Sequence, residues 1–164
     1  MATRRQELRP LDYVFLGFFA IHIPVIIFVD TGILWPAEHL PIVNKTLLEY
    51  YVATLNDQNF VDPPRFFTAY VWMEVLYHLP LSVWMMTAIL EQNPLVPLHQ
   101  LLFSVQTAVT TLTCVVEMFS WQYTRFEEIK LCTIYSLYIL LALVMGYDSF
   151  SRVSSALEGK AKSA

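Results

Sequence analysis

Four long apolar segments constrain the fold of this 164-residue chain more than any other feature. They cover residues 11–29, 66–90, 95–119 and 131–147. Each is long enough to cross the roughly 30 Å hydrocarbon core of a bilayer as a helix. Charged residues make up only 15% of the chain, against about 25% in soluble domains, and the mean hydropathy is +0.49. The sequence therefore predicts an all-α membrane protein built as a four-helix transmembrane bundle.

The two ends of the chain indicate its orientation. The N-terminal arm, residues 1–10, carries three arginines, and basic flanks favour the cytosolic side. Four spans return residues 151–164 to the same side. The last five residues, KAKSA, match the KxKxx retrieval pattern of endoplasmic-reticulum membrane proteins, which is read from the cytosol. We therefore expect both termini in the cytosol, a multi-pass protein of the endoplasmic-reticulum membrane, and a lumenal loop over residues 31–65.

The first apolar segment and the loop after it are open to other interpretations. No small-residue cleavage site follows residues 11–29, so we interpret them as a retained span and not as a signal peptide. In the loop, LLEYYVATL has helical apolar spacing, which predicts a short interfacial helix that lies over the bundle as a lid. The triplet Asn44-Lys45-Thr46 is a glycosylation sequon, and the sequence leaves its use open.

The second segment carries a carboxylic acid at its centre. Glu74 lies within YVWMEVLYHLPL, and a carboxylate in mid-membrane costs roughly 2.5 kcal/mol or more, so it is expected to face a cavity or a polar partner. His78 follows four residues later, on the same face of a regular helix, and Pro80 bends the helix beside them. Asp30, at the far end of the first segment, is able to converge with Glu74. Such a pair suits an amine, a sterol hydroxyl or a carbocation-like intermediate; a structural hydrogen bond for Glu74 and a helix cap for Asp30 are the alternatives.

Other candidate ligand-binding residues are polar or aromatic side chains inside the apolar segments. They are His22, Tyr70, Tyr77, Phe103, Gln106, Thr107, Thr110, Tyr135 and Tyr138. Helix–helix packing is the alternative for the threonines and tyrosines, and a hydrogen bond to another helix is the alternative for His22. No spacing of histidine and cysteine suits a metal, no cofactor motif is present, and the absence of a basic run argues against nucleic acid.

Four motifs occur in a specific order along nearly the whole chain. They are HIP followed by an aspartate (22–30), ExxYxLP (74–80), SVxTxxTTL (104–112) and YxxY (135–138). Together they resemble the EXPERA family, in its sigma-2 receptor type. The resemblance implies a bundle around a lipid-facing pocket, in which a neutral Glu74 bonds to Asp30 and Asp30 pairs with a cationic amine, with Thr110 and Tyr138 as walls. It also implies an endoplasmic-reticulum protein that handles cholesterol-like or oxysterol ligands, often as a homodimer.

Two departures from that type bear on the chemistry. His78 stands where the sigma-2 receptor has a glutamine, and Phe103 stands where it has a tyrosine. Because the same superfamily contains a sterol double-bond isomerase, proton transfer by Glu74, Asp30 and His78 is the alternative function. The isomerase pattern is incomplete here, since Ile26 and not a histidine precedes Asp30 by one turn, and the extra helix is missing. The sequence favours binding of sterol-like lipids and amines over catalysis, and both over a purely structural or trafficking role.

Overall fold

The computed structural model describes residues 7–36 and 38–163, and every regular element within them is helical. Four helical stretches are long and apolar enough to cross a membrane: Pro10–Leu34, Arg65–Leu90, Val96–Met118 and Arg125–Lys162. This confirms the predicted all-α architecture with four membrane-spanning stretches. Arg4, Arg5 and Ala164, which belong to the predicted arm and tail, lie outside the described residues.

The first span begins where the sequence places a proline and an acid. Helix α1 runs Pro10–Phe28, with the proline in the first turn, where its missing N–H is not needed. Arg9 and Asp12 form a capping box, in which the Arg9 backbone N–H donates to Asp12 Oδ2 at 3.0 Å. A 3₁₀ turn, Asp30–Leu34, extends the span and carries Asp30.

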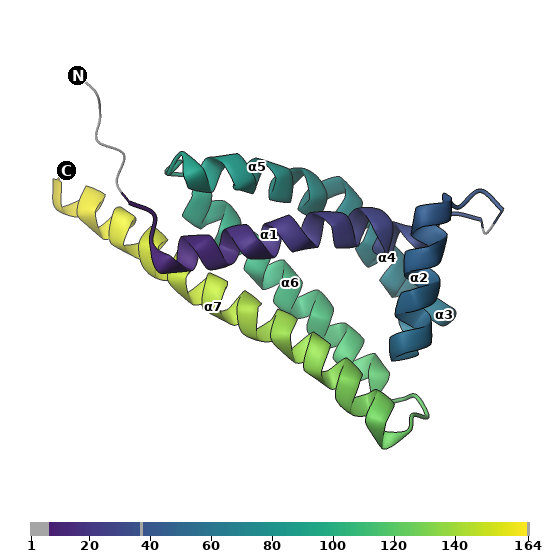
Figure 1. Cartoon of the computed structure of the whole chain (residues 1–164). Coiled ribbons are helices and arrows are strands. Elements are labelled where there is room, and N and C mark those ends of the chain that lie inside the picture. The colour runs from purple at the N-terminus through teal and green to yellow at the C-terminus, as the bar shows by residue number, and fades with distance from the viewer. Residues whose placement is uncertain (1–6, 37, 164) are drawn as a thin grey trace.

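The stretch between the first two spans is largely helical. Helix α2 (Ile42–Leu55) lies across the end of α1, and the short helix α3 (Gln58–Val61) follows it (Figure 1). The helix predicted over LLEYYVATL is therefore present, although it begins earlier than that stretch. Asn44 of the sequon is buried and its Nδ2 donates to the Ile27 carbonyl at 2.7 Å, so a glycan there would break the contact between α2 and α1.

The second span changes from α-helical to π-helical geometry at Glu74. Helices α4 (Arg65–Met73) and α5 (Leu79–Leu90) are joined without a break by a π-helical turn, Glu74–His78. Pro80 explains the wider turn, because its ring clashes with the carbonyl four residues earlier and it cannot donate the usual hydrogen bond. The distortion that the sequence predicts at Pro80 thus takes the form of a π turn.

The last two spans pack against each other along most of their length (Figure 1). Helix α6 runs Val96–Met118, close to prediction, but helix α7 runs Arg125–Ser163 and not 131–147. Residues 125–130, which precede the fourth apolar segment of the sequence, are thus part of the helix. Thr124 and Glu127 supply the reason, since the Glu127 carboxylate accepts from the Thr124 backbone N–H at 2.9 Å and from its hydroxyl at 2.7 Å.

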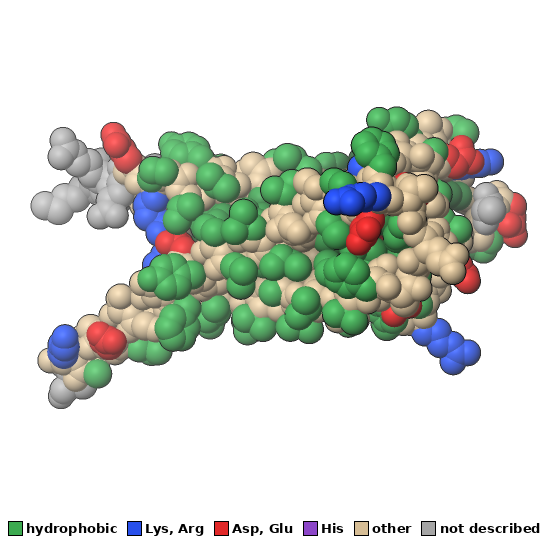
Figure 2. All heavy atoms as spheres, turned by 90° about the horizontal axis from the view of Figure 1, so that it is seen from below, with side chains coloured by type: hydrophobic (Ala, Val, Ile, Leu, Met, Phe, Trp, Pro, Cys, Tyr) green, Lys and Arg blue, Asp and Glu red, His purple; other side chains and the backbone are tan. Residues whose placement is uncertain are grey.

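The packed core lies in the half of the bundle away from α2. Phe15 and Phe19 of α1, Met85 of α5, Phe103 of α6 and Met145 of α7 are fully or almost fully buried there. The outer faces are apolar instead of polar, and in Figure 2 hydrophobic side chains cover the middle of the molecule while charges gather towards its ends. This distribution suits a bundle whose outer faces contact lipid.

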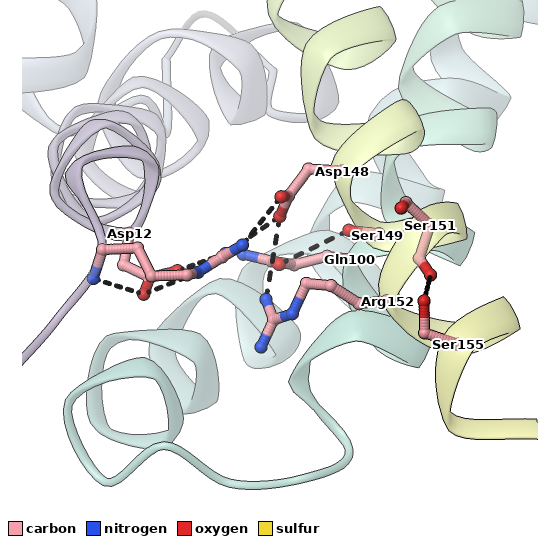
Figure 3. Close-up of polar contacts among 8 residues, drawn as sticks. Asp12, Gln100, Asp148, Ser149, Ser151, Arg152 and Ser155 are labelled. Atoms are coloured by element: carbon pink, nitrogen blue, oxygen red, sulfur yellow. Dashed lines mark hydrogen bonds and ion pairs between the residues drawn. The ribbon is translucent and has the colours of Figure 1, made fainter. Parts of the chain in front are cut away.

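A charged cluster ties the start of α1 to α7. The Arg9 guanidinium donates to both oxygens of Asp148, at 2.7 and 2.9 Å, and to Asp12 (Figure 3). Arg152 lies 3.7 Å from Asp148 on the other side. Two cations and two acids balance in this cluster, which holds together two elements far apart in the sequence.

Candidate functional site

A cavity of about 260 Å³ lies between α1, α4, α6 and α7, and the α2–α3 segment covers one end of it. Its walls are mostly apolar and aromatic. Val25 and Val29 come from α1 and its end, Phe67 from α4, and Ile134 from α7. Mostly apolar cavities with a few polar groups are the usual form of a small-molecule site.

Two carboxyls face this cavity from different spans. Asp30 enters from the turn after α1, and Glu74 enters from the first position of the π turn. Because both carboxyls line one cavity, a charge on one would disfavour a charge on the other. No described residue donates a hydrogen bond to either carboxyl in the contacts that the structure shows. An acid pair that the protein itself leaves unsatisfied is suited to a ligand that supplies the missing donor.

Five more of the predicted site residues line the same cavity. They are His22, Tyr70, Thr110, Tyr135 and Tyr138. His22 is 4% exposed, and neither of its ring nitrogens has a hydrogen-bond partner among the described residues. The hydroxyl of Tyr70 is already used in a hydrogen bond to Thr113 Oγ1 at 3.3 Å.

The other five predicted residues do not line the cavity. His78 is 2% exposed and packs against the ring of Phe103 at 4.2 Å between centroids, within the apolar core. Its ring also lies 5.9 Å, between centroids, from the ring of His22, so His78 packs behind a cavity wall and is not itself one.

The remaining three of these residues also have their side chains outside the cavity. The side-chain amide of Gln106 donates to the Met73 sulfur, Thr107 is buried away from the cavity, and Tyr77 packs against the core.

Several residues that line the cavity are not among the predicted site residues. Tyr51 and Phe60 come from the α2–α3 segment, where only the lid prediction hinted at a contact with the bundle. Thr111 lies beside Thr110 on α6, and Cys114 follows one turn later; both cysteines of the chain are free. No spacing in the sequence relates Tyr51 or Phe60 to Asp30, because the contact depends on how α2 folds back.

Among the described residues, no group of histidine, cysteine or acidic side chains is arranged to hold a metal ion.

Comparison with known proteins identifies the family of this chain. The EXPERA (expanded EBP superfamily) family model matches residues 43–149, well over half of the chain. The chain belongs to the EXPERA family. Over 158 residues it is 24% identical to sigma intracellular receptor 2 of Homo sapiens, covering 88% of this chain and 87% of that protein. The Macaca fascicularis protein of the same name gives the same figures.

A fungal protein is similar as well. The chain is 25% identical over 123 residues to efficient mitochondria targeting-associated protein 19 of Saccharomyces cerevisiae, covering 71% of this chain and 76% of that protein. Membership of this family agrees with the four spans and supports a membrane binding protein.

Proposed function

We propose that this EXPERA protein is a receptor-type binding protein for sterol-like lipids and hydrophobic cationic amines, which acts in sterol homeostasis or transport. The observation that carries the proposal is that Asp30 and Glu74 line one cavity whose other walls are mostly apolar and aromatic. In the proposed ligand-bound mode, Glu74 stays neutral and comes to donate a hydrogen bond to Asp30, a bond that the structure without ligand does not contain, and ionised Asp30 pairs with the ligand ammonium. A sterol hydroxyl would occupy the same position as donor and acceptor.

The surroundings of the pair support ligands of this class. Tyr138 and Val29 line the cavity beside Asp30, and an aromatic wall next to a carboxylate suits a cation that carries apolar substituents. Water is a poor competitor in such a site, so an ion pair formed there is stronger than on the surface.

The proposal is tested by equilibrium binding of a radiolabelled hydrophobic amine and a labelled sterol to purified protein. Asp30→Asn removes the counter-ion, and we expect amine affinity to fall at least about 30-fold. Glu74→Gln keeps a donor that faces Asp30, so we expect a smaller loss, about three- to tenfold. Glu117→Gln is the matched control, because this acid of α6 does not line the cavity. Unchanged binding in Asp30→Asn, or an equal loss in the control, would contradict the proposal.

Catalysis is the second function that the sequence raised, and the structure gives it less support. His78 was one of the three residues assigned to proton transfer, yet it packs in the core and does not face the cavity. Re-extraction of the labelled sterol after incubation distinguishes the two functions. A shifted double bond that disappears in Glu74→Gln would identify an isomerase, whereas sterol recovered unchanged supports binding alone.

Location and assembly complete the proposal. We propose residence in the endoplasmic-reticulum membrane with both termini in the cytosol, and assembly as a homodimer. Lys160 and Lys162 of the predicted signal are exposed at the end of α7, where a receptor can reach them. Imaging of Lys160→Ala/Lys162→Ala tests the location, and the mass of the detergent-solubilised protein by light scattering tests the dimer.

A further inference from the structure

The covered end of the cavity is formed by a short segment, residues 51–60. Tyr51 and Phe60 of this segment line the cavity, and their rings contact each other at 4.8 Å between centroids. Phe60 in turn contacts Phe67 of α4 at 5.0 Å. The segment therefore covers the end of the cavity that faces the loop between the first two spans. Its position decides whether that end is open to water.

Asp57 is the polar centre of this segment. It is fully buried, and its Oδ2 accepts from the hydroxyls of Tyr51 at 2.9 Å and Tyr135 at 2.7 Å. Its Oδ1 accepts from the backbone N–H of Asn59 at 3.0 Å and so caps α3, while Asn59 Nδ2 donates to the Tyr135 hydroxyl at 3.1 Å. Both tyrosines are cavity walls. One carboxylate thus joins two walls of the cavity, one from α2 and one from α7.

A second row of contacts joins the same segment to the start of α7. The Tyr123 hydroxyl donates to the Asn56 carbonyl at 3.0 Å, and Asn56 Nδ2 donates to Glu127 Oε1 at 3.0 Å. Lys130 Nζ donates to the Thr54 carbonyl at 3.0 Å. Asn56 has a left-handed backbone, with φ of 52°, which ends α2 and turns the chain towards Asp57. The segment is held to α7 by these polar contacts, which water is able to replace, and by apolar packing of Leu55 against Leu131.

We propose that residues 51–60 form a gate over the aqueous end of the cavity and that Asp57 holds the gate shut by positioning Tyr51 and Tyr135. Asp57 is a positioning residue, since it does not itself line the cavity. Closed, the gate keeps water away from the Asp30–Glu74 pair and leaves the bilayer as the route by which a hydrophobic ligand enters. This inference rests on the proposed function only where it concerns ligand retention; closure of the cavity to water is a property of the protein alone.

Cys114 is a built-in reporter of closure. It lines the cavity, is 5% exposed and is free, and the chain has one other cysteine, Cys132. In a Cys132→Ala background, full-length protein in nanodiscs is treated with a charged, water-soluble methanethiosulfonate, and modification of Cys114 is followed by intact mass. Slow labelling is expected in this parent.

The latch variants should open the cavity in a graded way. Asp57→Ala removes all three hydrogen bonds to the carboxylate, and we expect Cys114 to react at least about tenfold faster. Tyr135→Phe and Tyr51→Phe each remove one bond and should give smaller increases. Asp57→Asn keeps an acceptor for the tyrosines and should restore much of the protection. Asp62→Ala, an exposed acid of the same stretch, is the matched control and should leave the rate unchanged.

Local opening is distinguished from general loosening by a second thiol. In a background with Cys114 and Cys132 both changed to alanine, a cysteine introduced at Ala88, which is buried in the core and does not line the cavity, should label at the same rate with and without Asp57→Ala. Equal acceleration of both thiols would show a structural role only and overturn the proposal. So would fast labelling of Cys114 in the parent, or unchanged labelling in Asp57→Ala. If Asp57→Ala does not fold, unchanged labelling in both tyrosine variants overturns it equally.

Ligand retention gives the second readout. If the cavity binds the amine as proposed, dissociation of the labelled amine should be faster in Tyr135→Phe and Asp57→Ala than in Asp62→Ala. Because thiol labelling needs no ligand, failure of amine binding leaves the test of the gate intact, and the two proposals fail separately.

Discussion

At the scale of a single residue, the ionisation of Asp57 is linked to folding. Burial raises the pKa of the Asp57 carboxyl above its usual value, and hydrogen bonds from Tyr135, Tyr51 and Asn59 oppose that rise. The folded chain therefore holds this proton more tightly than the unfolded chain, in which aspartate titrates near about 3.9. The stability that Asp57 contributes is complete below that pH and is lost as the pH rises through the raised, folded-state pKa.

The prediction concerns Asp57→Asn, whose side chain stays neutral at every pH. The thermal stability of the parent relative to this variant should be greatest near pH 4 and should shrink as the pH is raised towards 7, measured by thermal unfolding in one detergent. Asp62→Asn, at an exposed acid, should show no such trend. A parent–variant difference that stays constant or grows with pH would contradict the raised pKa.

At the scale of the element, the α6–α7 contact depends on a small residue. A Cβ added at Gly146 of α7 would lie 3.0 Å from Ser104 Oγ of α6, whereas one added at Gly17 of α1 would meet nothing within 4 Å. Gly146→Leu should lower the free energy of unfolding by about 1–3 kcal/mol, because the two helices must separate. Gly17→Leu should be neutral or slightly stabilising.

The two glycine variants are compared by thermal unfolding, alone and combined with Ser104→Gly. If the contact between α6 and α7 is the cause, Ser104→Gly should recover part of the stability that Gly146→Leu loses. The same change should not raise the stability of Gly17→Leu. Equal effects of the two glycine substitutions would rule out a role for this contact.

At the scale of the whole molecule, polar clusters lie at the two ends of α7 and an apolar bundle lies between them. Arg9 joins α1 to Asp148 near one end, and Asp57 joins α2 and α3 to Tyr135 nearer the other. The Arg9 side chain is 39% exposed, so solvent screens its ion pairs. Arg9→Ala should lower the free energy of unfolding by only about 1 kcal/mol, and less at high salt.

Arg9→Lys should recover part of that loss, since a lysine cannot make the two-pronged contact with Asp148. Amine affinity should stay at the parent value in both variants, because Arg9 does not line the cavity. Thermal unfolding at two salt concentrations and amine binding check these outcomes, and a fall in affinity like that of Asp30→Asn would contradict the separation of the two ends.

The features that could be predicted from the amino-acid sequence are those that depend on residues close together in the chain. Long apolar stretches predicted four spans because hydropathy and length are local properties, and the mid-membrane acid Glu74 signalled a cavity because burial of a carboxyl is costly wherever the chain goes. The family motifs could be recognised as well, because each of them is a short run of neighbouring residues. The start of α7 was predicted too late in the chain, at residue 131. Hydropathy does not detect the capping box that Glu127 forms with Thr124, which starts the helix at Arg125.

Which side chains share the cavity depends on tertiary packing. His78 follows Glu74 by four residues, yet it packs against Phe103 in the core while Glu74 lines the cavity, so helical spacing alone did not identify the cavity walls. Tyr51 and Phe60 reach the cavity, and Asp57 joins two of its walls, because α2 and α3 fold back over the bundle. Such contacts arise from packing between segments far apart in the chain, and local spacing carries no information about how those segments meet.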